Sequence, residues 1–320
     1  MHVAERRGLR HRVAFGLEGL AVRASHALIA LLARLPHAAV IAAFRVVADC
    51  AFALHIRRRV LMQNLDLVYG ERRTGAEKLR IARSAMRNLF LSVAEMARGS
   101  HPRAQGDVAQ RLEFEPRALV DDLAADPRGI LLAVAHSGNW DLCGLRFVRD
   151  YGRPLAVVMK PLGTPRFNEM LIGARRGYGF EVISTDEGRV VPRCVQRLRE
   201  GGVVCMLPDQ YARRAGVVAD FLGVPASTHS GPALAMLRAP GCRLFAVVDT
   251  RQSDGARHVC HVREIEFRPS GDRRADIAAL TQQICDAIGA IVEKHPESYL
   301  WQHRRWRRRT GRGEATSEGS

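Results

Sequence analysis

Several motifs that would fix an enzyme class at once are absent from this 320-residue sequence. It has no C-x-x-C pair and no H-E-x-x-H helix, which speaks against a dedicated zinc site despite its 12 histidines. It also lacks a G-x-S-x-G elbow and a P-loop, which argues against an α/β-hydrolase and a nucleotide-dependent kinase. We expect no metal requirement.

Cysteines are few, and their spacing indicates no disulfide framework. The seven cysteines are odd in number, scattered along the chain and mostly set in apolar stretches. Such thiols are typical of reduced packing residues in a cytosolic protein.

Lysine and aromatic residues are also scarce. Only three of the 49 basic residues are lysine, a bias that a G+C-rich genome would also produce. The formal net charge is +16, so the chain should be attracted to polyanions, which include nucleic acid, an anionic membrane surface, and phosphorylated lipid with an acidic carrier protein. Aromatic residues for base stacking amount to only 6%, and we expect no nucleic-acid partner.

The aliphatic N-terminal stretch 13–54 contains no uncharged run long enough to span a bilayer. Charges and a proline interrupt it at Arg23, Arg34, Pro36, Arg45 and Asp49. A central arginine in lipid costs about 2.5 to 3.5 kcal/mol on insertion scales, so we expect helices that lie in the membrane interface. The alternative, in which these helices pack on the domain as core elements, stays open. We expect no signal peptide, because charge interrupts the apolar stretches and no persuasive cleavage site follows.

The most informative stretch is an aliphatic run that ends in a histidine. Residues 130–135 read Ile-Leu-Leu-Ala-Val-Ala, and His136 follows directly. A continuous apolar run of this kind is typical of a strand buried on both faces, and catalytic groups favour the ends of such strands.

A carboxylate follows the histidine after five residues. Ser137 and Gly138 supply a turn, and Asn139 can cap a new helix. Asp141 then falls in the first turn of that helix, where the dipole favours a negative charge. We therefore expect the side chains of His136 and Asp141 to face each other.

Such a pair would act as a general base. A carboxylate that accepts the proton of one ring nitrogen fixes the tautomer and leaves the other nitrogen to take a proton from an attacking hydroxyl. Backbone amides at Ser137, Gly138 and the new helix start could stabilise an oxyanion. A bare His and Asp at this spacing is more often a packed histidine near a helix cap, so support must come from the rest of the chain.

The passage Ala-His-Ser-Gly-Asn-Trp-Asp resembles the H-x-x-x-x-D site of the bacterial lipid A secondary acyltransferases and their phosphatidylinositol mannoside acyltransferase relatives. Further blocks resemble this family in the same order, at 57–70, 159–175, 207–210, 220–232 and 295–306. Together they cover roughly residues 12–309. Their ordered occurrence is far more specific than any single block.

The resemblance implies an acyltransferase that moves a fatty acyl group from an acyl thioester to a hydroxyl of a membrane glycolipid. It implies no cofactor, with acyl-acyl carrier protein or acyl-coenzyme A as the co-substrate. The implied acceptor is a lipid A precursor first, and a phosphatidylinositol mannoside or another lysolipid second. The implied location is the cytoplasmic face of the bacterial inner membrane, with peripheral or monotopic attachment.

The resemblance also nominates residues beyond the motif. Asp209, which follows the apolar run 203–207, would join His136 and Asp141 in the catalytic set or hold a substrate hydroxyl; an ordinary turn is its alternative. The substrate-binding set comprises Ser137, Gly138, Asn139, Lys160, Asn168 and Arg175. Lys160 and Arg175 are assigned to phosphate or carboxylate contacts. The family often has arginine where Lys160 stands, and lysine supplies a point charge instead of a planar fork.

The order of elements predicts a single glycerolipid-acyltransferase-like α/β domain with a mixed, mostly parallel sheet flanked by helices. Thr74 and Glu77 form a capping box at the start of a long amphipathic helix. Strands and helices then alternate, with strands at 155–159, 181–184, 203–207, 244–249 and 258–267, and helices at 168–176, 190–199 and 277–291. We divide the chain into an N-terminal helical membrane-associating extension (1–60), an acyltransferase domain (61–309) and a disordered tail (310–320).

A second class of function stays open. In it the His and Asp motif is degenerate, and the chain is a basic membrane- or nucleic-acid-binding protein. Nucleic-acid binding through several phosphates would weaken steeply with salt, and absence of any such affinity would discard that alternative.

Overall fold

The computed structural model describes the backbone of residues 2–213 and 216–307, and the side chains of residues 18–213 and 216–307. The strands are β1 (Leu112–Glu115), β2 (Ile130–Val134), β3 (Leu155–Met159), β4 (Phe180–Ser184), β5 (Val203–Met206), β6 (Gly216–Phe221), β7 (Val224–His229), β8 (Arg243–Arg251) and β9 (His258–Glu264). The helices are α1 (His2–Arg34), α2 (His37–Ala53), α3 (Arg58–Tyr69), α4 (Gly75–Gly99), α5 (Pro102–Ala109), α6 (Arg117–Ala125), α7 (Trp140–Tyr151), α8 (Pro165–Gly177), α9 (Val190–Arg199), α10 (Gly231–Arg238) and α11 (Arg273–Lys294). Short 3₁₀ helices occupy Gly70–Arg72, Thr185–Glu187 and Pro296–Ser298. The predicted tail 310–320 lies outside the described residues.

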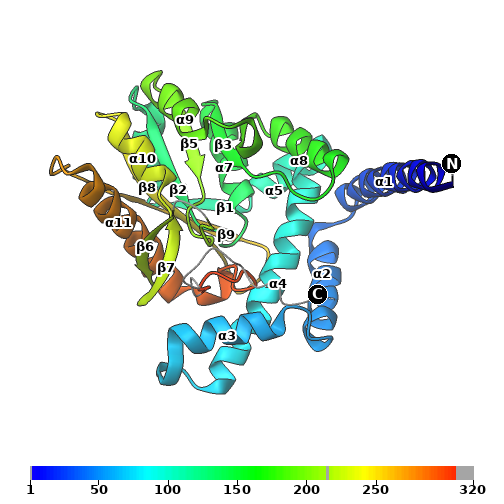
Figure 1. Ribbon diagram of the computed structural model, residues 1–320. Coiled ribbons are helices and arrows are strands. Elements are labelled where there is room, and N and C mark those ends of the chain that lie inside the picture. The colour runs from blue at the N-terminus through cyan, green and yellow to red at the C-terminus, as the bar shows by residue number, and fades with distance from the viewer. Residues whose placement is uncertain (1, 214–215, 308–320) are drawn as a thin grey trace.

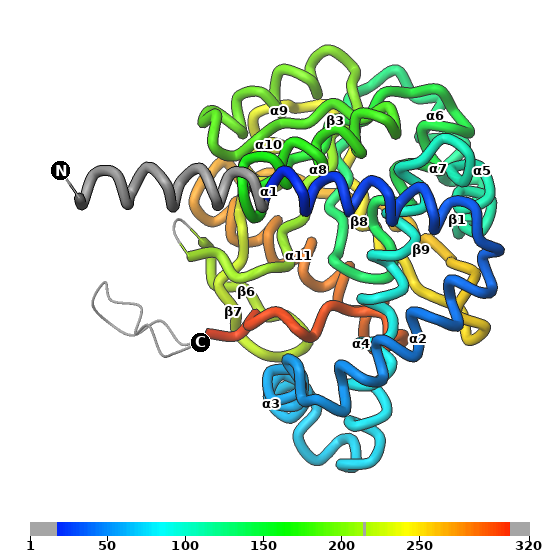
Figure 2. The backbone as a smooth tube through the Cα atoms, turned by 90° about the vertical axis from the view of Figure 1, so that its right-hand side faces the viewer, coloured from blue at the N-terminus to red at the C-terminus, as the bar shows by residue number. Residues whose placement is uncertain are grey.

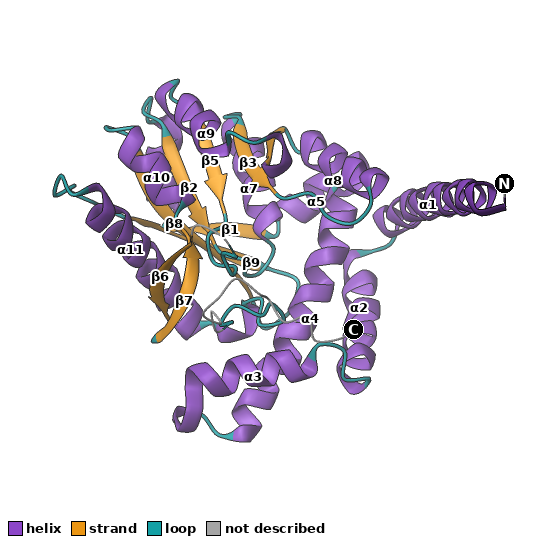
Figure 3. Cartoon of the chain, in the orientation of Figure 1, coloured by secondary structure: helices purple, strands orange, loops and turns teal. Residues whose placement is uncertain are grey.

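Seven of the described strands form one twisted sheet in the order β1-β9-β8-β2-β5-β3-β4 (Figures 1 and 3). Every neighbouring pair in it is parallel except β8 with β9. Strands β6 and β7 form a separate antiparallel hairpin. The predicted α/β class with a mixed, mostly parallel sheet is confirmed.

Alternating side chains of each central strand fill two different cores. In β2, Leu131 and Ala133 pack with α9, α10 and α11 on one face of the sheet. Leu132 and Val134 pack with α5, α6 and α7 on the other face. The strand is therefore apolar throughout because both of its faces are covered.

Predicted and observed elements agree best where the periodicity is strong. The capping box at Thr74 and Glu77 is present, and β3 and α9 have the predicted bounds. Sequence reasoning missed β1, α5, α6 and the β6–β7 hairpin, in which every helix or strand has nine residues or fewer. The predicted domain boundary at residue 60 stays a prediction.

The N-terminal helices dock on the long helix α4, and Figure 2 shows α2 running alongside it. The side chain of Arg98 on α4 is buried and donates to the carbonyl oxygens of Leu32 and Leu35, which lie at the end of α1. The carboxylate of Asp49 on α2 accepts hydrogen bonds from Arg83 and Arg87 of α4. One face of α2 thus packs on the domain through satisfied charges.

The same helices also carry exposed apolar side chains, at Leu20, Leu28 and Leu31 of α1 and at Val46 and Val47 of α2. Among the described helices, only α11 is by itself long and apolar enough to cross a membrane. Half of that apolar stretch is buried, and Leu280, Ile284 and Ile288 belong to the core under the sheet. α2 and α3 pass the same test only when joined, and they meet at a bend of 82°.

The segment after α11 runs along the edge of the sheet at which β2 and β5 end. Trp301 in this segment is fully buried against Tyr69, with ring centroids 5.8 Å apart. The side-chain amide of Asn64 on α3 donates to the carbonyl oxygens of Trp301 and His303, each at 2.8 Å. The segment is therefore a structural part of the domain.

A buried polar network lies between α4 and the ends of β8 and β9. Both carboxylate oxygens of Glu95 accept from the guanidinium of Arg251, at 2.6 and 2.7 Å. The ring of His258 lies between Glu95, at 3.2 Å, and Asp249, at 2.6 Å. Two carboxylates and two cations thus neutralise one another where water is excluded.

The charge of His258 is held by this network. Burial opposes protonation, but Asp249 and Glu95 outweigh it and raise the pKa of His258 to about 9 from its ordinary 6.5. Burial also raises the pKa of Glu95, but Arg251 and His258 outweigh this and bring it well below its usual range.

The free energy of unfolding should therefore fall as pH rises from about 6.5 through about 9. The folded protein keeps a proton that the unfolded chain releases, so this contribution is complete below pH 6.5 and is lost as His258 deprotonates in the native state, with a slope approaching about 1.4 kcal/mol per pH unit. Urea unfolding at a series of pH values measures it. The wild type should show this extra slope relative to His258→Asn, while the exposed-site control His55→Asn should follow the wild type. Parallel wild-type and His258→Asn profiles would contradict the assignment.

Candidate active site

His136 and Asp209 lie side by side because their strands are neighbours in register. In the parallel pair β2 and β5, Ala133 lies opposite Met206. Three residues further along the chain, just beyond the ends of the two strands, come His136 and Asp209. The Nδ1 atom of His136 lies 2.6 Å from Oδ1 of Asp209, and the backbone N–H of His136 donates to Oδ2 at 2.8 Å.

The carboxylate of Asp209 is ionised and almost fully buried, with 1% of its side chain exposed. Burial raises its pKa, but the attraction of His136, the hydrogen bonds from His136 and the charge of Arg305 outweigh this and bring the pKa of Asp209 below its ordinary value. An ionised carboxylate only accepts hydrogen bonds, so the proton between the two side chains belongs to Nδ1. The Nε2 atom of His136 is thereby left as the basic nitrogen of the ring.

Asp141 does not take the place expected for it. Its carboxylate is bound by Arg175 of α8 through two parallel hydrogen bonds, both of 2.9 Å. Asp141 lies in the first turn of α7 and binds Arg175 of α8, whereas the segment after β5 brings Asp209 directly beside His136. The expected pairing of His136 with Asp141 is therefore wrong for this structure, and the partner is Asp209.

The turn between His136 and α7 is rigidly held by the buried network. Asn139 caps α7 as predicted, accepting from the N–H of Leu142 at 3.2 Å, and its own side-chain amide donates to Glu95. The hydroxyl of Ser137 donates to the carbonyl oxygen of Asp249. Gly138 has a positive φ of 56°, and a Cβ there would lie 2.1 Å from the Asp249 carboxylate, so only glycine fits.

The backbone amides of this turn are already used within the protein. The N–H of Ser137 donates to Ala135, that of Gly138 to Ser298, and that of Asn139 to the carboxylate of Asp249. The expectation that the Ser137 and Gly138 amides stabilise an oxyanion therefore needs correction. Their hydrogen bonds fix the turn that carries His136.

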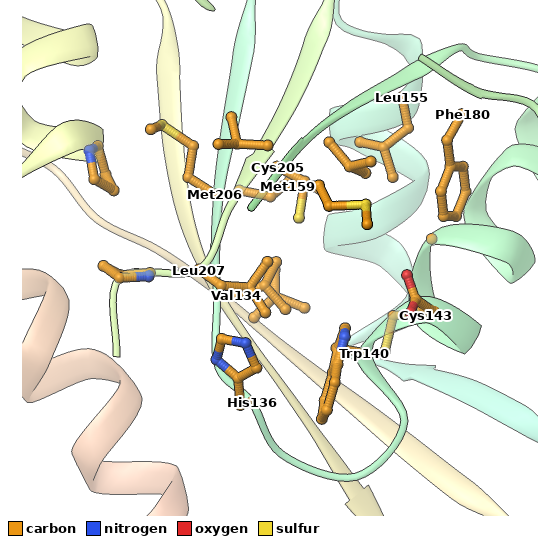
Figure 4. Close-up of a pocket in the computed structure, with 18 of the residues that line it drawn as sticks. Val134, His136, Trp140, Cys143, Leu155, Met159, Phe180, Cys205, Met206 and Leu207 are labelled. Atoms are coloured by element: carbon orange, nitrogen blue, oxygen red, sulfur yellow. The ribbon is translucent and has the colours of Figure 1, made fainter. Parts of the chain in front are cut away.

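An apolar cavity of about 550 Å³ opens beside His136. Figure 4 shows His136 and Trp140 at one end of it and Leu155 and Phe180 at the other. The rest of its wall comes mainly from the sheet face that α7 covers, with Leu132, Val134, Val157, Cys205 and Val247, and from Cys143 of α7 itself. A cavity of this size and apolarity fits a hydrophobic chain.

The three predicted acceptor-side residues have different surroundings. Lys160 is exposed and lines the cavity mouth. Arg175 also lines the cavity, but its guanidinium is engaged by Asp141. Asn168 accepts from the backbone N–H of Leu162 and so closes the loop before α8.

Sequence reasoning missed several residues at the cavity mouth. His229, Pro232 and Leu300 line it together with His136. Burial is the main cause that lowers the pKa of His229, so this ring is neutral at physiological pH. The end of β7, the start of α10 and the C-terminal segment supply these residues from far along the chain, and no local pattern near His136 could have indicated them.

Two thiols of the cavity wall, those of Cys143 and Cys205, are poor nucleophiles. Burial raises the pKa of Cys205 to about 12 and raises that of Cys143 well above its ordinary value. Among the described residues, no group of three or more His, Cys, Asp or Glu side chains is arranged to hold a metal ion. The arrangement thus offers one oriented imidazole at the mouth of an apolar cavity, which suits general-base activation of a hydroxyl.

The known proteins to which this chain is similar are all named as transferases of acyl groups. The chain is 29% identical over 182 residues to the phosphatidylinositol mannoside acyltransferase of Mycolicibacterium smegmatis. The aligned stretch covers 56% of this chain and 57% of that protein. It is 23% identical over 251 residues to lipid A biosynthesis acyltransferase 2 of Shigella flexneri, with 77% and 76% covered. The lipid A biosynthesis palmitoleoyltransferase of Escherichia coli K12 is 23% identical over 269 residues, with 79% of each chain covered.

The chain thus spans little more than half the length of the mannoside acyltransferases that it matches. The family model described as bacterial lipid A biosynthesis acyltransferase matches residues 20–308, which include the whole His136 site. On this match, the chain belongs to the bacterial lipid A biosynthesis acyltransferase family.

Proposed function

We propose that this protein transfers a fatty acyl group from an acyl thioester to a hydroxyl of a membrane glycolipid. One observation carries the proposal: the ring of His136, bound to the buried carboxylate of Asp209, lies at the mouth of an apolar cavity of about 550 Å³. A base and a hydrophobic pocket that meet at one point are what acyl transfer to a hydroxyl requires.

The cavity would hold the acyl chain. Its wall consists mainly of aliphatic, aromatic and sulfur-containing side chains from the sheet and from the helices that cover this face of it. Each methylene group removed from water contributes about 0.8 kcal/mol, so the chain alone gives substantial binding. A chain bound with its tail toward Phe180 puts its thioester carbonyl near His136 (Figure 4).

In the chemical step, Nε2 of His136 takes the proton of the acceptor hydroxyl while its oxygen attacks the thioester carbonyl carbon. The positive ring is stabilised by Asp209 at 2.6 Å. The tetrahedral intermediate then collapses, the carbon–sulfur bond breaks, and the proton on His136 passes to the leaving thiolate. The products are the acyl ester and a free thiol.

Direct transfer needs no acyl-enzyme. The hydroxyl of Ser137 donates to the carbonyl oxygen of Asp249 and is 1% exposed, so it is not presented to a substrate. The thiols of Cys143 and Cys205 are held neutral by burial. These three side chains are therefore unsuited to attack the thioester.

The charged groups at the cavity mouth have two roles: some hold helices in place, and one is available to bind a substrate. Arg175 and Asp141 satisfy each other and hold α8 against the start of α7. Lys160 is exposed at the mouth and supplies a point charge for a phosphate or carboxylate of either substrate.

We propose a lipid A precursor as the acceptor, with the acyl group carried by acyl carrier protein or coenzyme A. Two of the relatives named for lipid A biosynthesis, acyltransferase 2 of Shigella flexneri and the palmitoleoyltransferase of Escherichia coli, match over more than three quarters of both chains. A phosphatidylinositol mannoside is the second candidate, because the relatives of that name reach 29% identity, although over a shorter stretch.

We further propose that the protein acts from the cytoplasmic face of the inner membrane, lying on it. The exposed leucines and valines of α1 and α2 support contact with acyl chains, and arginines on the same helices suit lipid phosphates.

The direct test is acyl transfer by purified wild-type and His136→Ala protein. The substrates are acyl-acyl carrier protein and acyl-coenzyme A, each with a lipid A precursor or with phosphatidylinositol mannoside, and mass spectrometry follows the products. We expect His136→Ala to lower turnover by about 10² to 10⁴, because it removes the general base.

The matched control is Ser137→Ala in the same turn, which should keep most of the activity. Retention of more than half the wild-type rate by His136→Ala would refute the assignment. An acyl group found on the wild-type protein by intact mass would refute direct transfer. No transfer with either donor by folded, lipid-bound protein would favour the alternative of a basic binding protein.

Substitutions in the cavity should change the preferred chain length in opposite directions. Phe180→Ala opens space at the end far from His136 and should favour longer acyl thioesters, whereas Cys143→Phe fills the wall and should favour shorter ones. Relative kcat/KM for a series of acyl lengths measures this. Phe245→Ala is the control, since Phe245 is fully buried in the same core but does not line the cavity. An unchanged length preference in both cavity variants would contradict the proposed site for the chain.

A further inference from the structure

Arg305 is one of the most deeply buried side chains of the protein, with 1% of the residue exposed. Its guanidinium donates to the carbonyl oxygens of Gln210, at 2.9 Å, and Ser227, at 2.6 Å. It also donates to the hydroxyl of Thr228 at 2.6 Å and lies over the ring of Phe221. These partners are uncharged, and among the residues that the structure describes no carboxylate pairs with this guanidinium.

These contacts join the C-terminal segment to the residues that carry Asp209. Gln210 is the residue after Asp209, and the hydroxyl of Tyr299 donates to the carbonyl oxygen of Asp209 itself at 3.2 Å. Ser227 and Thr228 lie in β7, and His229 at the cavity mouth follows them directly. Arg305 thus holds both the loop that carries Asp209 and the strand that forms one wall of the cavity mouth.

Burying an arginine without an ion-pair partner is costly, and an apolar residue of similar volume would avoid this cost. Its charge acts on Asp209 across a region that excludes water, where electrostatic effects reach further than at the surface.

We propose that Arg305 is a positioning residue for the acyl transfer, which holds the Asp209 loop in place and sets, through its charge, the pH below which the His136–Asp209 pair loses activity. The inference rests on the proposed function. Removing the positive charge should make it easier for the pair to take up a proton, and a protonated His136 cannot accept the proton of the acceptor hydroxyl.

Other titratable side chains also lie close to the His136–Asp209 pair. Four titratable side chains interact electrostatically with Asp209 and Arg305, namely His229, Tyr299, His303 and Cys285. Lys160, Arg307 and Asp286 act in turn on His229, His303 and Cys285. Burial lowers the pKa of His303 to about 4 and raises that of Tyr299 well above its ordinary value. Both groups are therefore neutral across the working range, and Arg305 is the buried fixed cation beside the pair.

The test is the pH dependence of kcat/KM for acyl transfer by the full-length protein. Arg305→Gln should move the acid limb of the profile up by about one pH unit, in addition to lowering kcat. Arg305→Lys keeps the charge and should keep the wild-type limb. Arg304→Gln removes the same charge from an exposed position in the same segment and should leave both kcat and the limb unchanged. Arg305→Met serves if Arg305→Gln does not fold, because its chain can pack against Phe221 without a polar end.

A lower kcat or a lower melting temperature with an unmoved acid limb in the neutral variants would overturn the proposal and leave Arg305 a structural residue. A limb displaced in Arg305→Lys as far as in Arg305→Gln would overturn it as well. If the wild type shows no acyl transfer, the proposed function fails. The inference is then still tested by the pH at which the His136 ring takes up a proton in the same variants, followed by NMR of labelled histidine.

Discussion

The hydrogen bond between His136 and Asp209 is the contact on which the site depends. It exists because β2 and β5 are parallel neighbours in register, so that residues three positions beyond Ala133 and Met206 meet at the same edge. Asp209 fixes the ring of His136 through two hydrogen bonds, one donated by Nδ1 of the ring and one donated by the backbone N–H of His136. Both are accepted by a single ionised carboxylate, which is why the ring faces the cavity in a defined tautomer.

Two buried polar systems hold this contact from either side. Glu95 and Asp249 bind the turn through Asn139 and so fix the backbone that carries His136. The C-terminal segment holds the Asp209 loop through Tyr299 and Arg305. Between them the wall of the cavity is mainly apolar, and burial keeps the thiols of Cys143 and Cys205 in it neutral. Polar groups therefore fix the position of the His136 ring, and apolar groups determine which chain can bind beside it.

Local patterns in the sequence predicted the local structure well. The aliphatic run before His136 is a doubly buried strand, Asn139 caps α7, and the capping box at Thr74 is formed. The partner of His136 could not be derived in this way, because a carboxylate 73 residues away in sequence is brought close only by strand order and register. Asp141 looked like the partner because it is near in sequence, but α8 supplies Arg175 for it. The His229 wall and the Arg305 contact depend on the same long-range assembly.

The tautomer of His136 tests the account most directly. Nitrogen NMR of protein labelled at histidine, with the His136 signals assigned from His136→Gln, should show the neutral ring protonated on Nδ1 and unprotonated on Nε2. Asp209→Asn offers only one oxygen to the two N–H groups of His136, so it should disturb this tautomer, whereas Asp141→Asn should preserve it. A ring protonated on Nε2 in the wild type, or one that responds to Asp141→Asn and not to Asp209→Asn, would contradict the account.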